Sequence, residues 1–395
     1  MASTSGARAA VLVNAAFYGQ ISVILPLSIA GSGASKAQIA LFFAVSAVVA
    51  AVLNLVVGPQ LRRRGSPWWG PSLSGFVAAA GTLLVLAATP SPAMYLGGAA
   101  MMTMTLIFPH YMSVVAGSGT NGPARLVGRM RQVFVIGYMA GLALASAGGL
   151  LQEVLDGFQP LWIAAALALA DGLIPWLGAG KRVEPQPQPQ PELEPVAPRP
   201  GRARAHSTLL ICVLAVLLLR AADSVRLVYL PLFIVNEGRS ATFVALLLLV
   251  AVAAEVPLLG TVTAMADRIG SRRAVVLIAG VGLVSFALIV AGGGVATLIL
   301  SQLLYAVFAA GFQSVGMVLL SDVMDGGLGA GADVYTGIVQ VGVLCGVVAP
   351  LVVPGWSAWI FVLGALFCLA TMLLLTAIRR RLPPVSVRAA GHPPR

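Results

Sequence analysis

The sequence predicts an all-α integral membrane protein whose twelve transmembrane helices form two six-helix bundles. Hydrophobic residues make up 59% of the 395 residues and charged residues only 9%, against about 25% charged residues in ordinary soluble domains. A water-soluble fold of this size could not bury so much apolar surface. Apolar runs of bilayer-spanning length recur along the chain, and sequence marks of the first half return in the second half at one fixed offset.

The apolar runs set the number of predicted helices, because a helix needs about twenty residues at 1.5 Å each to cross a bilayer. Twelve ranges meet this requirement. They are 9–30, 37–61, 69–89, 93–117, 127–151 and 158–178, followed by 208–236, 240–262, 274–291, 295–320, 333–353 and 355–377.

A polar stretch at residues 179–207 separates the two groups of six. Its sequence EPQPQPQPELEPVAPRP alternates proline with polar residues and cannot form a spanning helix. We therefore expect an N-terminal six-helix bundle over 1–178, a cytoplasmic proline-rich linker over 179–207, a C-terminal six-helix bundle over 208–378 and a cytoplasmic basic tail over 379–395.

Basic residues predict the orientation, since cytoplasmic loops of membrane proteins carry an excess of Lys and Arg. The alternate gaps that we assign to the cytoplasm hold Arg62, Arg63, Arg64, Arg125, Arg129, Arg131, Arg268, Arg272 and Arg273. The opposite gaps hold only Lys36 and Arg239. We expect both termini in the cytoplasm and the chain in the cell (inner or plasma) membrane. The net charge of +11 then reflects topology anchors, and we expect no binding to nucleic acid.

The two halves of the chain repeat one another at an offset of 205 residues. The LPL of residues 25–27 returns at 230–232, and Gly137 and Gly141 return as Gly342 and Gly346. With an even number of helices in each half, both copies insert the same way up, which gives parallel repeats. Gly137, Gly141, Ala145 and Gly148 also form a stripe of small residues that permits close contact with a neighbouring helix.

This pattern resembles the major facilitator superfamily over essentially the whole chain. The hallmark turn of that superfamily is kept at Asp267, Arg268, Gly270, Arg272 and Arg273 and lacks its acid in the first half. Three segments resemble the bacterial sugar efflux transporters: YLPLFI at 229–234, Glu255-x-Pro257, and the entry into the fifth range at 129–141. The resemblance implies proton-linked export of sugars or sugar-like compounds by alternating access, with a site between the two bundles.

The seventh range carries three charges, Arg220, Asp223 and Arg226. Each costs about 2.5 to 3.5 kcal/mol at the centre of a bilayer, so the three side chains are expected to face protein or a wet cavity. Their i, i+3 spacing lets Asp223 pair with either arginine. A purely structural ion pair is the alternative, but it leaves the surplus positive charge unexplained.

The acids inside the apolar ranges are candidates for proton coupling. Glu255 stands alone in its range, two residues before Pro257, and a buried isolated carboxyl group tends to stay protonated. We expect Asp223 and Glu255 to couple protons, the alternative for Glu255 being a packing role. Asp171 is assigned mainly to structure.

Other polar residues within the ranges are candidates for hydrogen bonding to a substrate, and the alternative is a satisfied contact between helices. Helices one, four, seven and ten line the cavity in the resembling family. The candidates are Asn14, Tyr18, Gln20, His110, Arg226, Tyr229, Gln302 and Gln313.

A cytoplasmic gate is predicted from loops of opposite charge. Arg125 and Arg129 precede the fifth helix, whereas Asp322 and Asp325 precede the eleventh. Rocking bundles would bring them together when the cavity opens outward, each exposed pair contributing about 0.2 to 1 kcal/mol. Asp267 and Arg268 of the hallmark turn belong to the same conformational group. The alternative is that both loops are solvated and the arginines only anchor the topology.

The function expected from these residues is secondary active export of a sugar-like molecule, with protons and the lipid bilayer as further partners and a monomeric state. An exporter of antibiotics or other drugs is the second hypothesis, and a non-transporting membrane sensor or scaffold the third. We expect no enzyme activity, cofactor or metal, because the sequence shows no phosphate-binding glycine loop and no metal-spaced cluster of His and Cys.

Overall fold

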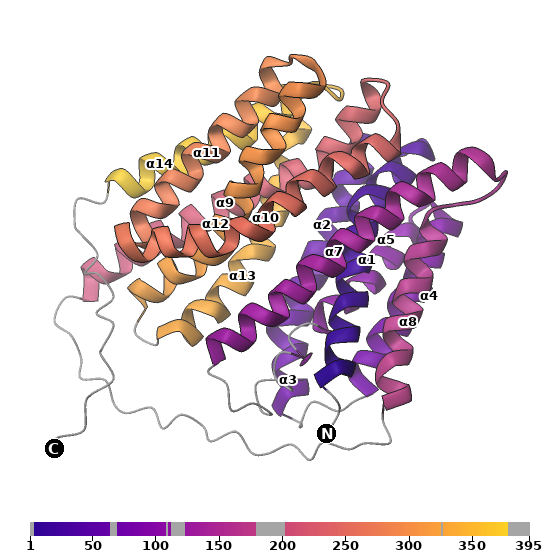
Figure 1. Cartoon of the computed structure of the whole chain (residues 1–395), viewed down its shortest axis with the longest axis horizontal. Helices are drawn as coiled ribbons and strands as arrows, with labels where there is room; N and C mark the ends of the chain where they lie inside the picture. The colour runs from indigo at the N-terminus through magenta and orange to yellow at the C-terminus, as the bar shows by residue number, and fades with distance from the viewer. Residues whose placement is uncertain are drawn as a thin grey trace.

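The computed structural model describes residues 4–63, 69–107, 110–111, 123–178, 202–324 and 327–377. These residues form two groups of tilted helices lying side by side, one from each half of the chain (Figure 1). Within them, nine helices are long and apolar enough to cross a membrane, and shorter apolar helices cover Ala93–Leu106, Leu161–Pro175 and Gly337–Val352. Each of these segments falls on one of the predicted ranges. The prediction of a multi-pass helical membrane protein is confirmed.

The described residues of the first half are mostly helical. This half contains α1 (Thr4–Gly31), α2 (Lys36–Val52), the π-helical η1 (Leu53–Val57), α3 (Gly58–Arg63), α4 (Trp69–Ala88), α5 (Ala93–Met101), the 3-10 helix η2 (Met102–Leu106), α7 (Pro123–Val154) and α8 (Leu161–Gly178). Ser35 caps α2, since its hydroxyl accepts from the Gln38 amide at 3.2 Å and the Gln38 side chain accepts from the Ser35 amide at 2.8 Å.

The second half contains α9 (Arg202–Asn236), α10 (Ala241–Ile269), α11 (Ser271–Ala291), α12 (Gly294–Val323), α13 (Gly327–Val348), η3 (Ala349–Val352) and α14 (Ile360–Ala377). Several helices begin earlier than hydropathy predicts. Among them, α7 starts at Pro123 and α9 at Arg202, so Arg125 and the last residues of the expected linker are helical. Hydropathy detects only the apolar turns of a helix, whereas these helices continue through polar turns.

Helix packing repeats between the halves. In the first half α1 packs against α7 and α8, α4 against α5 and α8, and α2 against α5. In the second half α9 packs against α13 and α14, α11 against α12 and α14, and α10 against α12. Each pair of the first half has a counterpart in the second at the equivalent predicted ranges.

The small-residue stripe explains this repetition at atomic level. A Cβ atom added to Gly141 would lie 2.0 Å from the carbonyl oxygen of Ala16, and one added to Gly346 would lie 2.2 Å from that of Ala221. Ala16 and Ala221 are themselves 205 residues apart. Equivalent glycines therefore bring equivalent pairs of helix backbones together in the two halves, which confirms the predicted close contact.

The two bundles meet mainly where α7 packs against α10 and α2 against α13, and α1 also contacts α9 and α10. Lys36 reinforces the second meeting where the chain turns from α1 into α2. Its Nζ donates to the carbonyl oxygens of Val353 at 2.7 Å and Gly355 at 2.9 Å. The same nitrogen lies 5.7 Å from the ring centroids of Tyr229 and Trp356. We call this group of contacts the Lys36 bridge.

Candidate functional site

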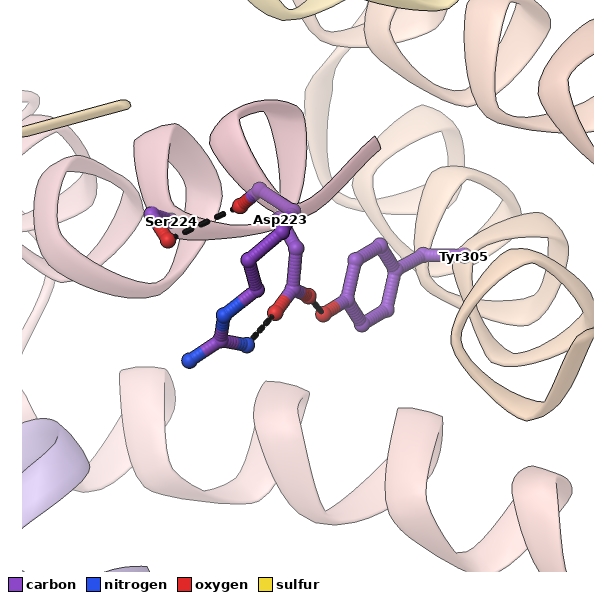
Figure 2. A network of polar contacts seen from close by, with 4 residues as sticks. Asp223, Ser224 and Tyr305 are labelled. Atoms are coloured by element: carbon purple, nitrogen blue, oxygen red, sulfur yellow. Dashed lines mark hydrogen bonds and ion pairs between the residues drawn. The ribbon is translucent and has the colours of Figure 1, made fainter. Parts of the chain in front are cut away.

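Of the three charges in the middle of α9, Asp223 and Arg226 bind partners on α12, and Arg220 binds Asp223. Asp223 is 1% exposed, one of its carboxylate oxygens accepts from the Arg220 guanidinium, and the other accepts from the Tyr305 hydroxyl. Figure 2 shows the carboxylate held between these two groups. The predicted pairing of Asp223 with a neighbouring arginine is confirmed, and the partner is Arg220.

Arg226 takes a separate set of partners. The side chain is buried, donates to the Gln302 side-chain oxygen, and places its guanidinium carbon 3.3 Å from the centroid of the Tyr305 ring. Gln302 donates in turn to the Ser301 hydroxyl at 3.0 Å. Tyr305 therefore contacts both the acid through its hydroxyl and the second arginine through its ring face.

Tyr138 on α7 and Glu255 on α10 lie within electrostatic range of this network. Tyr138 on α7 and Tyr305 both interact with the charges of Asp223, Arg226 and Glu255. Tyr138 belongs to the first half, whereas the other four residues belong to the second. The network therefore faces the boundary between the two bundles. We call Arg220, Asp223, Arg226, Gln302 and Tyr305 the α9–α12 cluster.

The α9–α12 cluster contains buried hydrogen-bond donors that have no partner among the described residues. The Nε atoms of Arg220 and Arg226 are buried and have no hydrogen-bond partner among the residues that the structure describes. Buried donors without a partner are costly in a folded protein. Two of them in one cluster mark a place where a ligand oxygen could be bound.

The substrate candidates of the first half lie elsewhere. The Asn14 amide nitrogen donates to Asp171 on α8 and to the Met104 carbonyl, both at 3.2 Å, and Tyr18 interacts with the charge of Asp171. Gln20 donates to the Pro160 carbonyl at 3.0 Å. These contacts hold the first bundle together and do not meet the α9–α12 cluster.

The remaining substrate candidates are dispersed. His110 packs edge-on against Tyr111, with ring centroids 5.2 Å apart. Tyr229 donates its hydroxyl to the Val347 carbonyl at 2.6 Å and lies in the Lys36 bridge. Gln313 is half-buried further along α12. Of the eight candidates, only Arg226 and Gln302 belong to the α9–α12 cluster.

Little of the predicted gate falls in the part of the chain that can be described. Asp325 and the side chains of Arg125 and Arg129 lie outside the described residues. Asp322 accepts a hydrogen bond from the Ser271 hydroxyl within the second half. Asp267 and Arg268 are exposed at the end of α10, next to Gly270, whose φ of +88° favours glycine.

Sequence reasoning missed Tyr305 and Tyr138. A signal existed for each, since Tyr305 follows Gln302 by three residues on the same helix face and Tyr138 directly follows Gly137 of the small-residue stripe.

A cavity of about 540 Å³ lies away from the α9–α12 cluster, at the ends of α1, α4 and α8, lined among others by Ser28, Thr89 and Gln159. Within the described ranges, no group of three or more His, Cys, Asp or Glu could hold a metal ion.

Comparisons with known proteins agree on the kind of molecule. The chain is 28% identical over 183 residues to sugar efflux transporter B of Salmonella typhimurium, covering 44% of this chain and 46% of the relative. It is 28% identical over 204 residues to sugar efflux transporter A of Dickeya chrysanthemi, covering 51% and 50%. The chain thus spans about half the length of the curated relatives it matches. No protein-family model matches it.

Solved structures show the fold over nearly the whole chain. A mutant of the nucleoside transporter NupG aligns with a TM-score of 0.78 at 16% identity, covering 95% of this chain and 98% of the other. A D-xylose-proton symporter aligns with a TM-score of 0.70 at 14% identity, covering 94% and 96%. The chain has the fold of major facilitator superfamily transporters and resembles the sugar efflux transporters in sequence.

Proposed function

We propose that this chain is a secondary transporter that exports sugars or sugar-like small polar molecules. One observation carries the proposal: the α9–α12 cluster holds two buried arginine donors without partners at the boundary between two bundles. Sugar hydroxyl and ring oxygens are suitable acceptors for such donors. The named activity of the two relatives supports the choice of sugars.

The proposed cycle is alternating access by two six-helix bundles, over 1–178 and 208–378, joined by the cytoplasmic linker 179–207 and followed by the tail 379–395. We place all twelve helices across the membrane and both termini in the cytoplasm, on the strength of the arginine distribution. The substrate binds between the bundles, with Arg226 and Gln302 on one side. Asn14, Tyr18, Gln20, His110, Tyr229 and Gln313 are the further candidates for binding it.

Proton antiport follows from the arrangement around Asp223, with Glu255 as the second coupling residue. An antiporter requires that the proton and the substrate exclude each other. While Asp223 is ionised, it holds Arg220 and Tyr305 in place and so orients the donors for the substrate. A proton on Asp223 removes the charge that holds Arg220 and loosens the donors, which lowers the affinity for the substrate without abolishing its binding.

The gate proposal complements this cycle. Arg125 and Arg129 are proposed to meet Asp322 and Asp325 when the cytoplasmic side closes, with Asp267 and Arg268 beside them. Arg125→Asp with Arg129→Asp should increase the labelling of cavity cysteines from the cytoplasmic side, and adding Asp322→Arg with Asp325→Arg should reverse that increase. Unchanged labelling in the first variant would leave these residues as topology anchors.

Efflux from proteoliposomes tests the function directly. Labelled galactoside or glucoside analogue should leave faster when the protein and an opposing proton gradient are both present. Asp223→Asn and Glu255→Gln should abolish gradient-driven efflux while retaining substrate binding, and Glu153→Gln, at an exposed acid of α7, is the matched control. Protection of cells only against lipophilic cations or dyes would replace sugars by drugs as the substrate class.

A further inference from the structure

The first bundle contains a buried acid that the proposed cycle does not use. Asp171 lies on α8 with 0% of its surface exposed, in contact with Asn14, which is equally buried. One carboxylate oxygen accepts from the Asn14 amide nitrogen at 3.2 Å, and the same nitrogen also donates to the Met104 carbonyl. Asp223 has a guanidinium partner, whereas the partner of Asp171 is a neutral amide.

The helices around Asp171 supply no counter-charge. Across α1, α4, α5 and α8, the formally charged residues are Arg8 and Asp171. Arg8 is exposed and precedes Asn14 by six residues, about 9 Å along the helix axis. The titratable groups that face Asp171 are Tyr18 on α1 and Tyr111, with His110 beside Tyr111. An ionised carboxylate buried without a cationic partner is strongly unfavourable.

The hydrogen-bonding groups of this cluster favour a proton. Asp171 Oδ1, Asn14 Oδ1 and the Tyr18 hydroxyl are buried and have no hydrogen-bond partner among the described residues. Two of the three atoms can only accept and the third, the Tyr18 hydroxyl, supplies a single hydrogen, so the cluster is one donor short while Asp171 is ionised. A proton on the carboxyl group supplies that donor and removes the uncompensated charge at once.

We propose that Asp171, Asn14 and Tyr18 form a second proton-binding site, located inside the first bundle. In the step itself, a proton leaves water, bonds to a carboxylate oxygen of Asp171, and returns to water on release, with no other bond changed. The Asn14 amide carries two N–H groups and donates to both Asp171 and the Met104 carbonyl. When the proton leaves, the charged carboxylate attracts the amide more strongly, and its bond to the Met104 carbonyl weakens.

Met104 gives this exchange a structural consequence. It lies in η2, the 3-10 segment that follows α5, and a 3-10 segment within a longer helix often marks a hinge. Proton binding at Asp171 thus changes the bonding of the segment Met102–Leu106. The coupling to transport rests on the proton-driven cycle proposed above, but proton binding can be tested without any transport.

Infrared titration of the purified full-length protein tests the site. The band of protonated carboxylic acids should weaken as the pH is raised in the wild type, and the part of this change that belongs to Asp171 should be missing in Asp171→Asn, while the parts from the other carboxyl groups remain. The Asp171 part should persist in Asp223→Asn and Glu255→Gln, which keep Asp171. A wild-type band that does not respond to pH, or the same response in Asp171→Asn, would overturn the proposal.

A swap of the two side chains separates proton binding from simple packing. Asn14→Asp combined with Asp171→Asn keeps one carboxyl and one carboxamide in contact and should restore the missing part of the band's change. Loss of that part in Asp171→Asn with recovery in the swap supports a proton site. Absence of recovery in a swap that folds with an unchanged melting temperature would count against it. If no sugar moves in the efflux assay but the band titrates, the site stands and the proposed substrate fails.

Discussion

The two halves share a backbone frame but differ in the polar groups mounted on it. Gly141 and Gly346 make the same contact with carbonyl oxygens 205 residues apart. At the same offset, the position of Asp223 is occupied in the first half by Tyr18, and Arg220 and Arg226 have apolar counterparts. The second half concentrates ion pairs, whereas the first half buries one acid without a cation. Packing was thus retained in both copies, while charge was placed in one.

The largest effect should come from breaking the Arg220–Asp223 ion pair, which has no counterpart among the described residues of the first half. Asp223→Ala leaves the Arg220 charge without a partner and Tyr305 without an acceptor, so we expect a loss of about 4 kcal/mol in stability. Arg220→Met with Asp223→Leu should recover most of it, because no unpaired charge remains. Thermal unfolding in detergent measures both. A double variant as unstable as Asp223→Ala would show that the pair is not the cause.

Replacing the equivalent glycines of the two halves should lower the stability of the protein by similar amounts. Gly141→Ala and Gly346→Ala place a Cβ atom against a backbone oxygen, and each should cost about 3 kcal/mol through forced separation of the helices. Gly260→Ala is the matched control, since its added Cβ meets nothing within 4 Å. Melting temperatures that fall in one half only would show that the frames are not equivalent.

Two tyrosines sharpen the contrast between the halves. Tyr305→Phe removes a hydrogen bond to an ionised acid and should cost about 2 kcal/mol. Tyr18→Phe, at the position equivalent to Asp223, removes a buried hydroxyl that has no partner among the described residues, so stability should stay within about 0.5 kcal/mol. Equal losses in the two variants, measured by thermal unfolding, would contradict the assignment of partners.

The smallest effect concerns the contact between the halves. Lys36→Met removes the donor of the Lys36 bridge and should weaken closure of the bundles by about 1 kcal/mol. Distances between spin labels at Ala37 and Trp359, both exposed, should then shift towards longer values, with Lys36→Arg as the charge-retaining control. An unchanged distance distribution would reduce the bridge to a local contact.

The sequence predicts the features that depend on neighbouring residues. Apolar ranges locate the helices, the glycine stripe locates the close contacts, and the i, i+3 spacing predicts that Asp223 pairs with Arg220 or Arg226. Each of these requires knowledge of one helix or of one repeated pattern. These features make up most of the fold and the centre of the site.

The features that the sequence does not predict depend on distant or irregular contacts. Tyr305 and Gln302 lie 82 and 76 residues from their partners on α9, and no local pattern states that α9 and α12 meet. The π-helical turn at Leu53–Val57 interrupts a range that hydropathy treats as one straight helix. Asp171 was assigned to structure because its lack of a counter-charge emerges only when the neighbouring helices are assembled.

The Lys36 bridge also allows the conformation of the unaltered protein to be followed by the chemical reactivity of one lysine. The sequence contains two lysines, Lys36 and Lys181, and Lys181 lies in the linker that we place in the cytoplasm. The Lys36 amine is engaged by two carbonyl oxygens when the bundles are joined at this end. A membrane-impermeant, amine-reactive reagent added from outside should therefore modify a single side chain, and only in molecules whose bundles have separated. The rate of that modification would follow the opening of the unaltered protein in intact cells, without an introduced label.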